Sequence, residues 1–92
     1  MVCPSLNESS FHIEIYPNPA TNTLFLNGVV GVEAETKYTI INSFGIVEIE
    51  KGLGSDNGII YEEINISDLN EGIYVLKFVS GNELVNKIFV KN

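Results

Sequence analysis

The chain has very few of the residues from which catalytic and metal sites are built. Its 92 residues include one histidine, His12, one cysteine, Cys3, and neither arginine nor tryptophan. A histidine-based triad or a zinc site of the usual spacing would find no further members. The single thiol also excludes a disulfide within the chain. We therefore expect no enzyme activity, no metal and no cofactor.

The chain also has little positive charge. Twelve acidic residues oppose five lysines, the net charge is −7, and both halves of the sequence are acidic. Such a chain repels phosphate backbones, and it has no arginine with which to bind bases or phosphates. No apolar run approaches the length needed to cross a bilayer. We therefore expect no nucleic acid partner and no direct membrane insertion.

Three weaker candidates for chemistry have simpler explanations. Glu62 and Glu63 are adjacent on an expected strand, which points them to opposite faces rather than at one substrate. The glycine-rich residues 52–58 lack the spacing of a dinucleotide-binding loop and precede a strand, not a helix. Asp56, Asn57, Asp68, Asn70 and Glu71 could offer oxygens to calcium, but turns are rich in Asp and Asn for conformational reasons alone.

What the sequence does have is the apolar–polar alternation of β-strands. Residues 1–10 are polar and aperiodic, which predicts a linker, whereas residues 11–92 carry the regular pattern of one domain. Short apolar stretches are separated by turn signals, and helical periodicity is missing. The pattern predicts an all-β fold: a small antiparallel β-sandwich, immunoglobulin-like, with about seven strands. A small barrel is the alternative. The expected strands are residues 11–16, 23–26, 37–42, 46–50, 59–66, 73–80 and 83–90, while 28–36 fits either a loop or an irregular edge strand.

Some local expectations follow from this pattern. The tetrapeptide Tyr16-Pro17-Asn18-Pro19 should be a stiff, extended crossing between strands, because proline lacks an N–H and extends the residue before it. Asn27-Gly28 and residues 42–45 should form turns. Within strand 46–50, Val47 and Ile49 should face the core. The central core should contain Tyr38, Ile40, Tyr74, Leu76 and Phe78.

Several short motifs occur in an order typical of one family. The Tyr-Pro-Asn-Pro tetrapeptide is followed by apolar residues 24–26, by a polar-x-x-Gly turn that ends at Gly45, and by a Leu-x-x-Gly-x-Tyr motif. A final strand with lysines comes last. Together these motifs resemble the C-terminal sorting domain of the type IX secretion system of Bacteroidetes, from about residue 13 to the end. The turn departs mildly, because it starts with Asn42 where the family more often has Asp.

The resemblance implies a role that composition does not show. Such a domain is an address label on a larger exported protein, which crosses the periplasm and is recognised by the outer-membrane secretion machinery. A sortase-like peptidase typically removes the label, and the cargo reaches the cell surface or the medium. Cargo domains would then precede residues 1–10, cleavage would fall there or just upstream, and Met1 would be an artificial start.

The resemblance also selects the residues that the machinery could recognise. Each has a structural explanation as well, as a crossover, a turn, a packing residue or a strand edge. The candidates are Tyr16, Pro17, Asn18, Pro19, Gly45, Leu69, Gly72, Tyr74, Lys87 and Lys91. The alternative function is an immunoglobulin-like carbohydrate- or protein-binding module of a secreted protein, which would display aromatic side chains on an exposed face. A passive spacer is the third possibility.

Overall fold

The structure is a computed structural model that describes residues 12–30, 35–53 and 58–92, and every regular element in these ranges is a strand. The strand pairs are antiparallel throughout. This confirms the all-β prediction, while the expected linker, residues 1–10, lies outside the described ranges. The strands are β1 (His12–Tyr16), β2 (Thr23–Val29), β3 (Thr36–Ile41), β4 (Val47–Leu53), β5 (Ile59–Asn65), β6 (Gly72–Ser80) and β7 (Glu83–Lys91).

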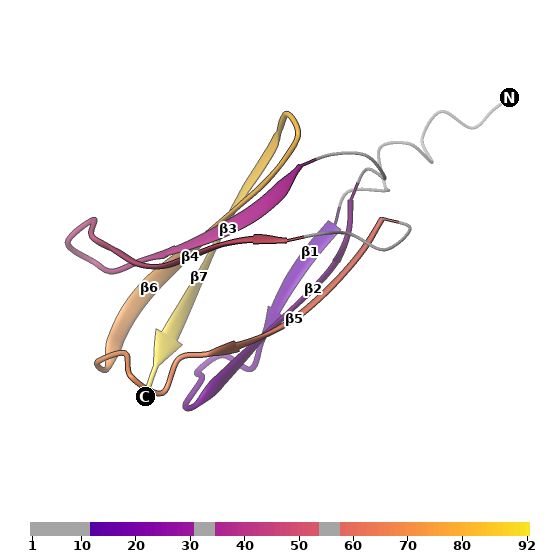
Figure 1. Cartoon of the computed structure of the whole chain (residues 1–92). Coiled ribbons are helices and arrows are strands. Elements are labelled where there is room, and N and C mark those ends of the chain that lie inside the picture. Colours follow the sequence, from indigo (N-terminus) through magenta and orange to yellow (C-terminus); the bar gives the residue numbers. More distant parts are fainter. Residues whose placement is uncertain (1–11, 31–34, 54–57) are drawn as a thin grey trace, which may run out of the picture.

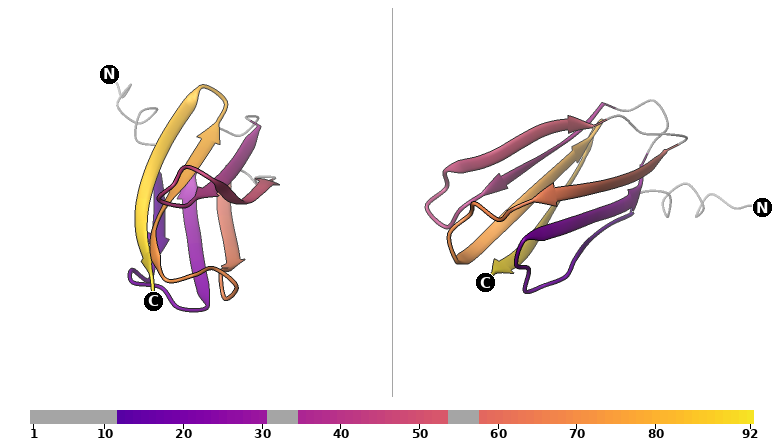
Figure 2. Two further views of the ribbon diagram at one scale, coloured as in Figure 1. Left: turned by 90° about the vertical axis from the view of Figure 1, so that its left-hand side faces the viewer. Right: turned by 60° about the horizontal axis from the view of Figure 1, so that its bottom comes forward.

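The strands form two sheets that face each other, as Figure 1 shows. One sheet has three strands in the order β1-β2-β5, and the other has four in the order β4-β3-β6-β7. The two views of Figure 2 show the sheets as separate layers of a sandwich. Edge strands β1 and β7 contact each other on one side. On the other side, the edge strands β4 and β5 do not pair, but Lys51 of β4 contacts Glu62 of β5 with 2.7 Å between Nζ and Oε2.

The core lies between the sheets and follows the alternation of the sequence. In β6, Tyr74, Leu76 and Phe78 point inward while Ile73 and Lys77 point outward. All five residues expected in the central core are buried. The apolar–polar alternation of the sequence predicts these buried positions, because successive side chains of a strand point to opposite faces of the sheet. The largest fully buried side chains are Phe78, Phe89, Leu24, Leu26, Ile40, Ile66 and Leu76.

The expected turn at Asn27-Gly28 was wrong, because β2 continues through both residues to Val29. Gly28 pairs with Ile13 of β1 on one side and with Ile60 of β5 on the other. A Cβ at Gly28 would collide with the Ile13 side chain and with the backbone oxygen of His12. This glycine therefore serves a close approach of two strands and not a chain reversal.

The inward position expected for Val47 was also wrong, since this side chain is 54% exposed. The pairing of β3 with β4 shifts register between Ile40 and Ile41. On one side of the shift Ile49 pairs with the buried Ile40, and on the other Val47 pairs with Ile41, which points outward. An extra residue in one strand reverses the alternation beyond it. Ile49 packs against the core as expected.

Candidate functional site

The Tyr-Pro-Asn-Pro segment, residues 16–19, fastens the edge of the last strand. The Asn18 side chain donates from Nδ2 to the Ile88 backbone oxygen at 3.1 Å. The Val90 N–H donates to Asn18 Oδ1 at 2.9 Å. One side-chain amide thus mimics a neighbouring strand and pairs with two outward-facing backbone groups of β7. Without it, these groups would belong to an open sheet edge.

The residue after this segment continues the attachment through its backbone. The Ala20 N–H donates to the Val90 oxygen at 2.8 Å, and the Asn92 N–H donates to the Ala20 oxygen at 2.8 Å. Ala20 thereby forms an isolated parallel bridge with Lys91, and it is fully buried. Residues 16–20 therefore join the end of β1 in one sheet to the end of β7 in the other.

The segment is not the extended crossing that the sequence suggested. Both the Tyr16–Pro17 and the Asn18–Pro19 peptide bonds are cis, and the chain bends at Asn18 and Pro19. The Tyr16 hydroxyl accepts a hydrogen bond from Asn27 Nδ2 at 2.8 Å, which attaches the start of the bend to β2. In this bent segment the Asn18 amide reaches the backbone of β7.

The second motif, residues 42–45, is a hairpin turn as expected. Asn42 Oδ1 accepts from the N–H groups of Phe44 at 2.8 Å and Ile46 at 3.0 Å. Gly45 has φ of 84°, a conformation that residues with a Cβ rarely adopt. Asp in place of Asn42 would offer the same acceptor, which explains why either residue can start this turn. The turn leaves the Phe44 side chain 86% exposed at its tip.

The third motif, Leu-x-x-Gly-x-Tyr, builds the corner between the two sheets. The Tyr74 hydroxyl donates to the Asn70 backbone oxygen at 2.6 Å, and the ring stacks on Phe89 with 5.5 Å between centroids. Burial raises the pKa of the Tyr74 hydroxyl, and Glu48 adds to the effect. This is the tyrosine corner of immunoglobulin-like sandwiches. Leu69 packs against the core, and Gly72 begins β6 with φ of 154°.

The two lysines of the final strand are not a free cationic stripe. Lys91 is buried, and its Nζ donates to the Asn92 oxygen at 3.1 Å. Lys87 is half-buried and pairs with Leu76 on the inward-facing row of β7.

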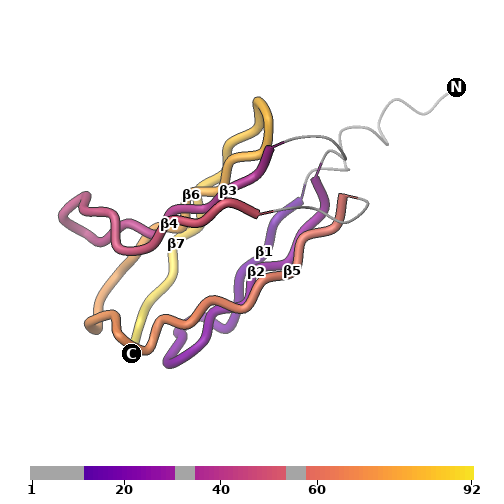
Figure 3. The backbone as a smooth tube through the Cα atoms, viewed as in Figure 1, coloured from indigo at the N-terminus to yellow at the C-terminus, as the bar shows by residue number. Residues whose placement is uncertain are grey.

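The structure places most of these candidates, which span residues 16–91 of the sequence, toward one end of the sandwich, while Lys87 lies in the middle of β7. Figure 3 shows the β1–β2 and β5–β6 connections beside the end of β7, while the β3–β4 hairpin projects away from them at the left of the view. The strand registers also place the end of β3, the start of β6 and the end of β7 toward the same end of the sheet, because Ile41 pairs with Val75 and Gly72 pairs with Lys91. We call this the motif end. At the motif end, most candidate residues stabilise the turns and strand contacts of the fold and do not project into solvent as a recognition surface.

The motif end carries exposed apolar side chains that the sequence analysis missed. They lie at the tip of the β3–β4 hairpin and on the outer face of the four-stranded sheet. We call them the apolar border, and they are Phe44, Ile46, Val47, Ile73 and Ile88. A signal for them was present, since residues 73–76 of β6 are apolar without interruption, and such a run is typical of a strand covered on both faces.

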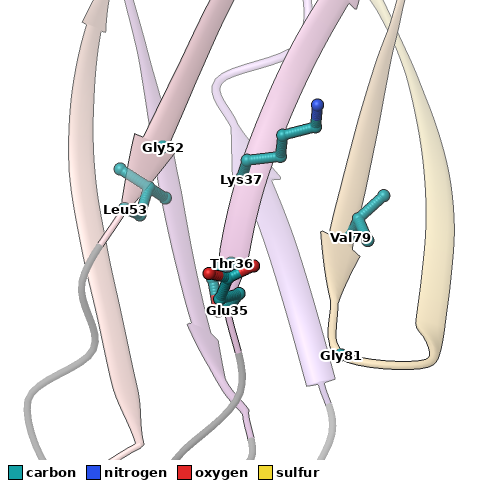
Figure 4. A pocket seen from close by; sticks show the side chains of 7 residues that line it. All are labelled: Glu35, Thr36, Lys37, Gly52, Leu53, Val79 and Gly81. Atoms are coloured by element: carbon teal, nitrogen blue, oxygen red, sulfur yellow. The ribbon is translucent and has the colours of Figure 1, made fainter.

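The opposite end of the four-stranded sheet holds a shallow hollow of about 540 Å³. As Figure 4 shows, the hollow is lined by Glu35 just before β3 and by Thr36 and Lys37 at its start, with Gly52 and Leu53 of β4 and Val79 of β6. Lys37 Nζ contacts Glu50 Oε2 at 3.2 Å and is therefore already paired. Among the residues that the structure describes, no group of three or more His, Cys, Asp or Glu could hold a metal. The same residues contain no helix that is long and apolar enough to cross a bilayer.

One buried ionisable group lies outside the motifs. Burial, with a smaller contribution from Glu62, raises the pKa of the Tyr38 hydroxyl to about 12. Glu62 pairs with Lys51 at the open side between β4 and β5. Both features serve the packing between the two sheets.

Comparison with known proteins adds one family to this geometry. The family model of the secretion system C-terminal sorting domain matches residues 14–92. The match includes all the motif segments and every strand, apart from the first two residues of β1. No curated protein and no solved structure matched the chain.

Proposed function

Because the chain belongs to the family of type IX secretion C-terminal sorting domains, we propose that the outer-membrane machinery recognises it as a folded unit at the motif end. As a sorting signal, it marks an exported protein bound for the cell surface or the medium. The proposed route of the precursor leads through the periplasm. Cargo domains precede this chain, and the chain itself has no catalytic role.

The gathering of the motifs at one end is the observation that supports this proposal. Separate segments of the family pattern are used to hold β7 in place and to shape two turns beside it. These residues therefore act on recognition through the fold. The apolar border remains available for contact, and exposed apolar patches of this kind mark protein interaction sites.

Removal of the domain is the second part of the proposal. A sortase-like peptidase cuts at or just before residues 1–10, and the chain is its substrate. Polar, aperiodic linkers are suitable cleavage sites, because an extended chain must enter a protease active site. The folded part would be released intact after cargo delivery.

The test is a fusion of residues 11–92 to a periplasmic reporter in a host with type IX secretion. We expect the reporter at the surface or in the medium, and we expect it to stay in the periplasm when β7 is deleted. Secretion that persists without β7 would refute the sorting signal. A reporter that stays periplasmic even with the complete domain would favour a passive spacer.

A matched pair of substitutions tests the motif end itself. Ile88 and Leu84 lie on the same outer face of β7, and their exposures are 63% and 57%, but Leu84 lies at the other end. We expect Ile88→Ser to lower secretion of the reporter and Leu84→Ser to leave it unchanged. Equal effects of the two changes would show that the machinery does not distinguish the two ends.

A further inference from the structure

The outer face of the three-stranded sheet differs chemically from the rest of the molecule. Its cross-strand rows combine aromatic rings and carboxylates, in particular Glu14, Phe25, Tyr61 and Glu63. Strands β1, β2 and β5 contain no lysine, because all five lysines of the chain lie in the four-stranded sheet. The sandwich therefore has one sheet without a basic side chain other than His12.

Three rings form a row across this face. Tyr16 stacks on Phe25 with 5.6 Å between ring centroids, and Phe25 stacks on Tyr61 at 6.4 Å. A stacked row leaves ring faces uncovered at its two ends. These ends are the more exposed rings, Tyr16 at 40% and Tyr61 at 60%.

A hollow of about 370 Å³ lies beside the Tyr61 end of the row. Glu14 and Asn27 supply polar groups to its lining, and Val29, Ile59 and Tyr61 supply apolar surface. Glu14 is held by His12, with 2.9 Å between Nε2 and Oε2, and both side chains are exposed. A carboxylate has a second oxygen with which to meet an arriving donor.

The local field at this hollow is negative. The Tyr61 hydroxyl donates to Glu63 Oε2 at 3.5 Å. Desolvation raises the pKa of this hydroxyl, and the nearby Glu63 and Tyr16 add to the effect. The contribution of Glu63 to this shift is Coulombic, and the negative charge of the same carboxylate attracts a cation.

We propose that this aromatic and acidic face docks an arginine side chain of a partner protein, with the guanidinium between Glu14 and the Tyr61 ring. The aliphatic stem would lie along Val29 and Ile59, and the planar head would stack on the ring while it donates to the carboxylate. The face of an aromatic ring attracts a cation, and a carboxylate beside the ring can accept a charge-assisted hydrogen bond from the same cation. This function is additional to sorting and does not depend on the motif end.

A second copy of the chain fits the face less well. The chain has no arginine. On the outer face of the four-stranded sheet, Lys37 is already paired with Glu50, so Lys77 is the other exposed lysine on that face. One lysine is a weak match for a face that offers both a ring and a carboxylate. The partner is therefore a different, arginine-bearing protein.

The test uses the isotope-labelled 92-residue chain and a short peptide in which arginine alternates with glycine. We expect amide shifts to move at Asn27, Val29 and Tyr61 on addition of the peptide, and the effect should weaken as ionic strength rises. A peptide with glutamine in place of arginine and a neutral oligosaccharide serve as comparisons. Equal shifts with the glutamine peptide or the oligosaccharide would overturn the proposal. So would shifts confined to the four-stranded sheet, self-association of the chain, or no shifts at all.

Paired variants identify the groups that act. Tyr61→Leu and Glu14→Gln should each weaken peptide binding about two- to fivefold, which is the range of one exposed cation–π or charge contact. Tyr61→Phe retains the ring, and Glu83→Gln removes one negative charge from β7, so both should bind like the parent chain. Dispersed spectra would show that each variant is folded. Binding that Tyr61→Phe weakens as much as Tyr61→Leu would contradict the role of the ring face.

Discussion

Substitution of Asn18 tests whether the Tyr-Pro-Asn-Pro segment stabilises the fold through β7. Asn18→Ala removes both the donor to the Ile88 oxygen and the acceptor of the Val90 N–H. Each net hydrogen bond contributes about 0.5–1.5 kcal/mol, and water can reach this exposed site to replace part of the loss. We expect the free energy of unfolding to fall by about 1.5 kcal/mol, which corresponds to a decrease in Tm of roughly 6–12 °C for a domain of this size.

Urea and thermal unfolding measure the loss, and two further variants calibrate it. Asn18→Asp keeps the acceptor but not the donor and should lie between the parent and Asn18→Ala. Asn86→Ala is the control, because Asn86 is an exposed asparagine on β7, the strand that Asn18 contacts, and its side chain has no hydrogen bond to the described residues. Its effect should stay within about 0.5 kcal/mol.

Hydrogen exchange shows where the loss occurs. The Val90 amide should exchange faster in Asn18→Ala, whereas Phe89, which pairs with Tyr74 of β6, should be affected less. If Asn18→Ala were as stable as Asn86→Ala and the Val90 amide remained equally protected, the segment would not fasten the strand edge. Residues 16–19 would then regain their interpretation as a surface epitope.

Two further predictions concern the core. Gly28→Ala should lower the free energy of unfolding by about 1–3 kcal/mol, because the new Cβ collides with Ile13 and with the His12 backbone oxygen. In the control, Gly52→Ala, the Cβ meets open space, so the change should stay within about 0.5 kcal/mol. Equal midpoints of the two variants in urea would contradict the close approach of β1 and β2. Stability should also fall above pH 10, because the Tyr38 hydroxyl ionises near pH 10 in the unfolded chain and only near pH 12 in the folded one, so that the unfolded state binds fewer protons in this window. Tyr38 should contribute roughly 2–3 kcal/mol of this loss by pH 12. In urea titrations at successive pH values, Tyr38→Phe should therefore lose less stability than the parent chain by that amount, while it keeps the loss due to the raised pKa values of Tyr61 and Tyr74. A parent chain with the same pH profile as that variant would refute the prediction.

Alternation predicted what depends on near neighbours in the sequence. The inward positions of Tyr38, Leu76 and Phe78 follow from a period of two residues, and the turn at Gly45 follows from its own tetrapeptide. The error at Val47 arose because a register shift depends on the partner strand, which a single strand does not reveal. At Asn27-Gly28 the same dipeptide suits a turn and a crowded central strand, and only the position of Ile13 decides between them.

The candidate site was predicted in its residues but not in its arrangement. The motif list contained Asn18, yet its partners lie 70 and 72 residues away, beyond any local pattern. The spacing of Leu69, Gly72 and Tyr74 was itself the pattern of a tyrosine corner, and could have been interpreted so. The aromatic row was hidden because Tyr16, Phe25 and Tyr61 come from three strands whose order only the sheet establishes.

The hydrogen bonds between Asn18 and β7 join residues that are far apart in the sequence, so the fold can be completed only late in the synthesis of the domain. Contacts that close loops of this length are formed slowly and cannot begin until the far residues are present. During synthesis, Asn18 leaves the ribosome while Ile88 and Val90 are still to be added, so a precursor that is truncated upstream of them never completes its sheet. A domain that is closed by its own last strand therefore completes its fold only after that strand has been made.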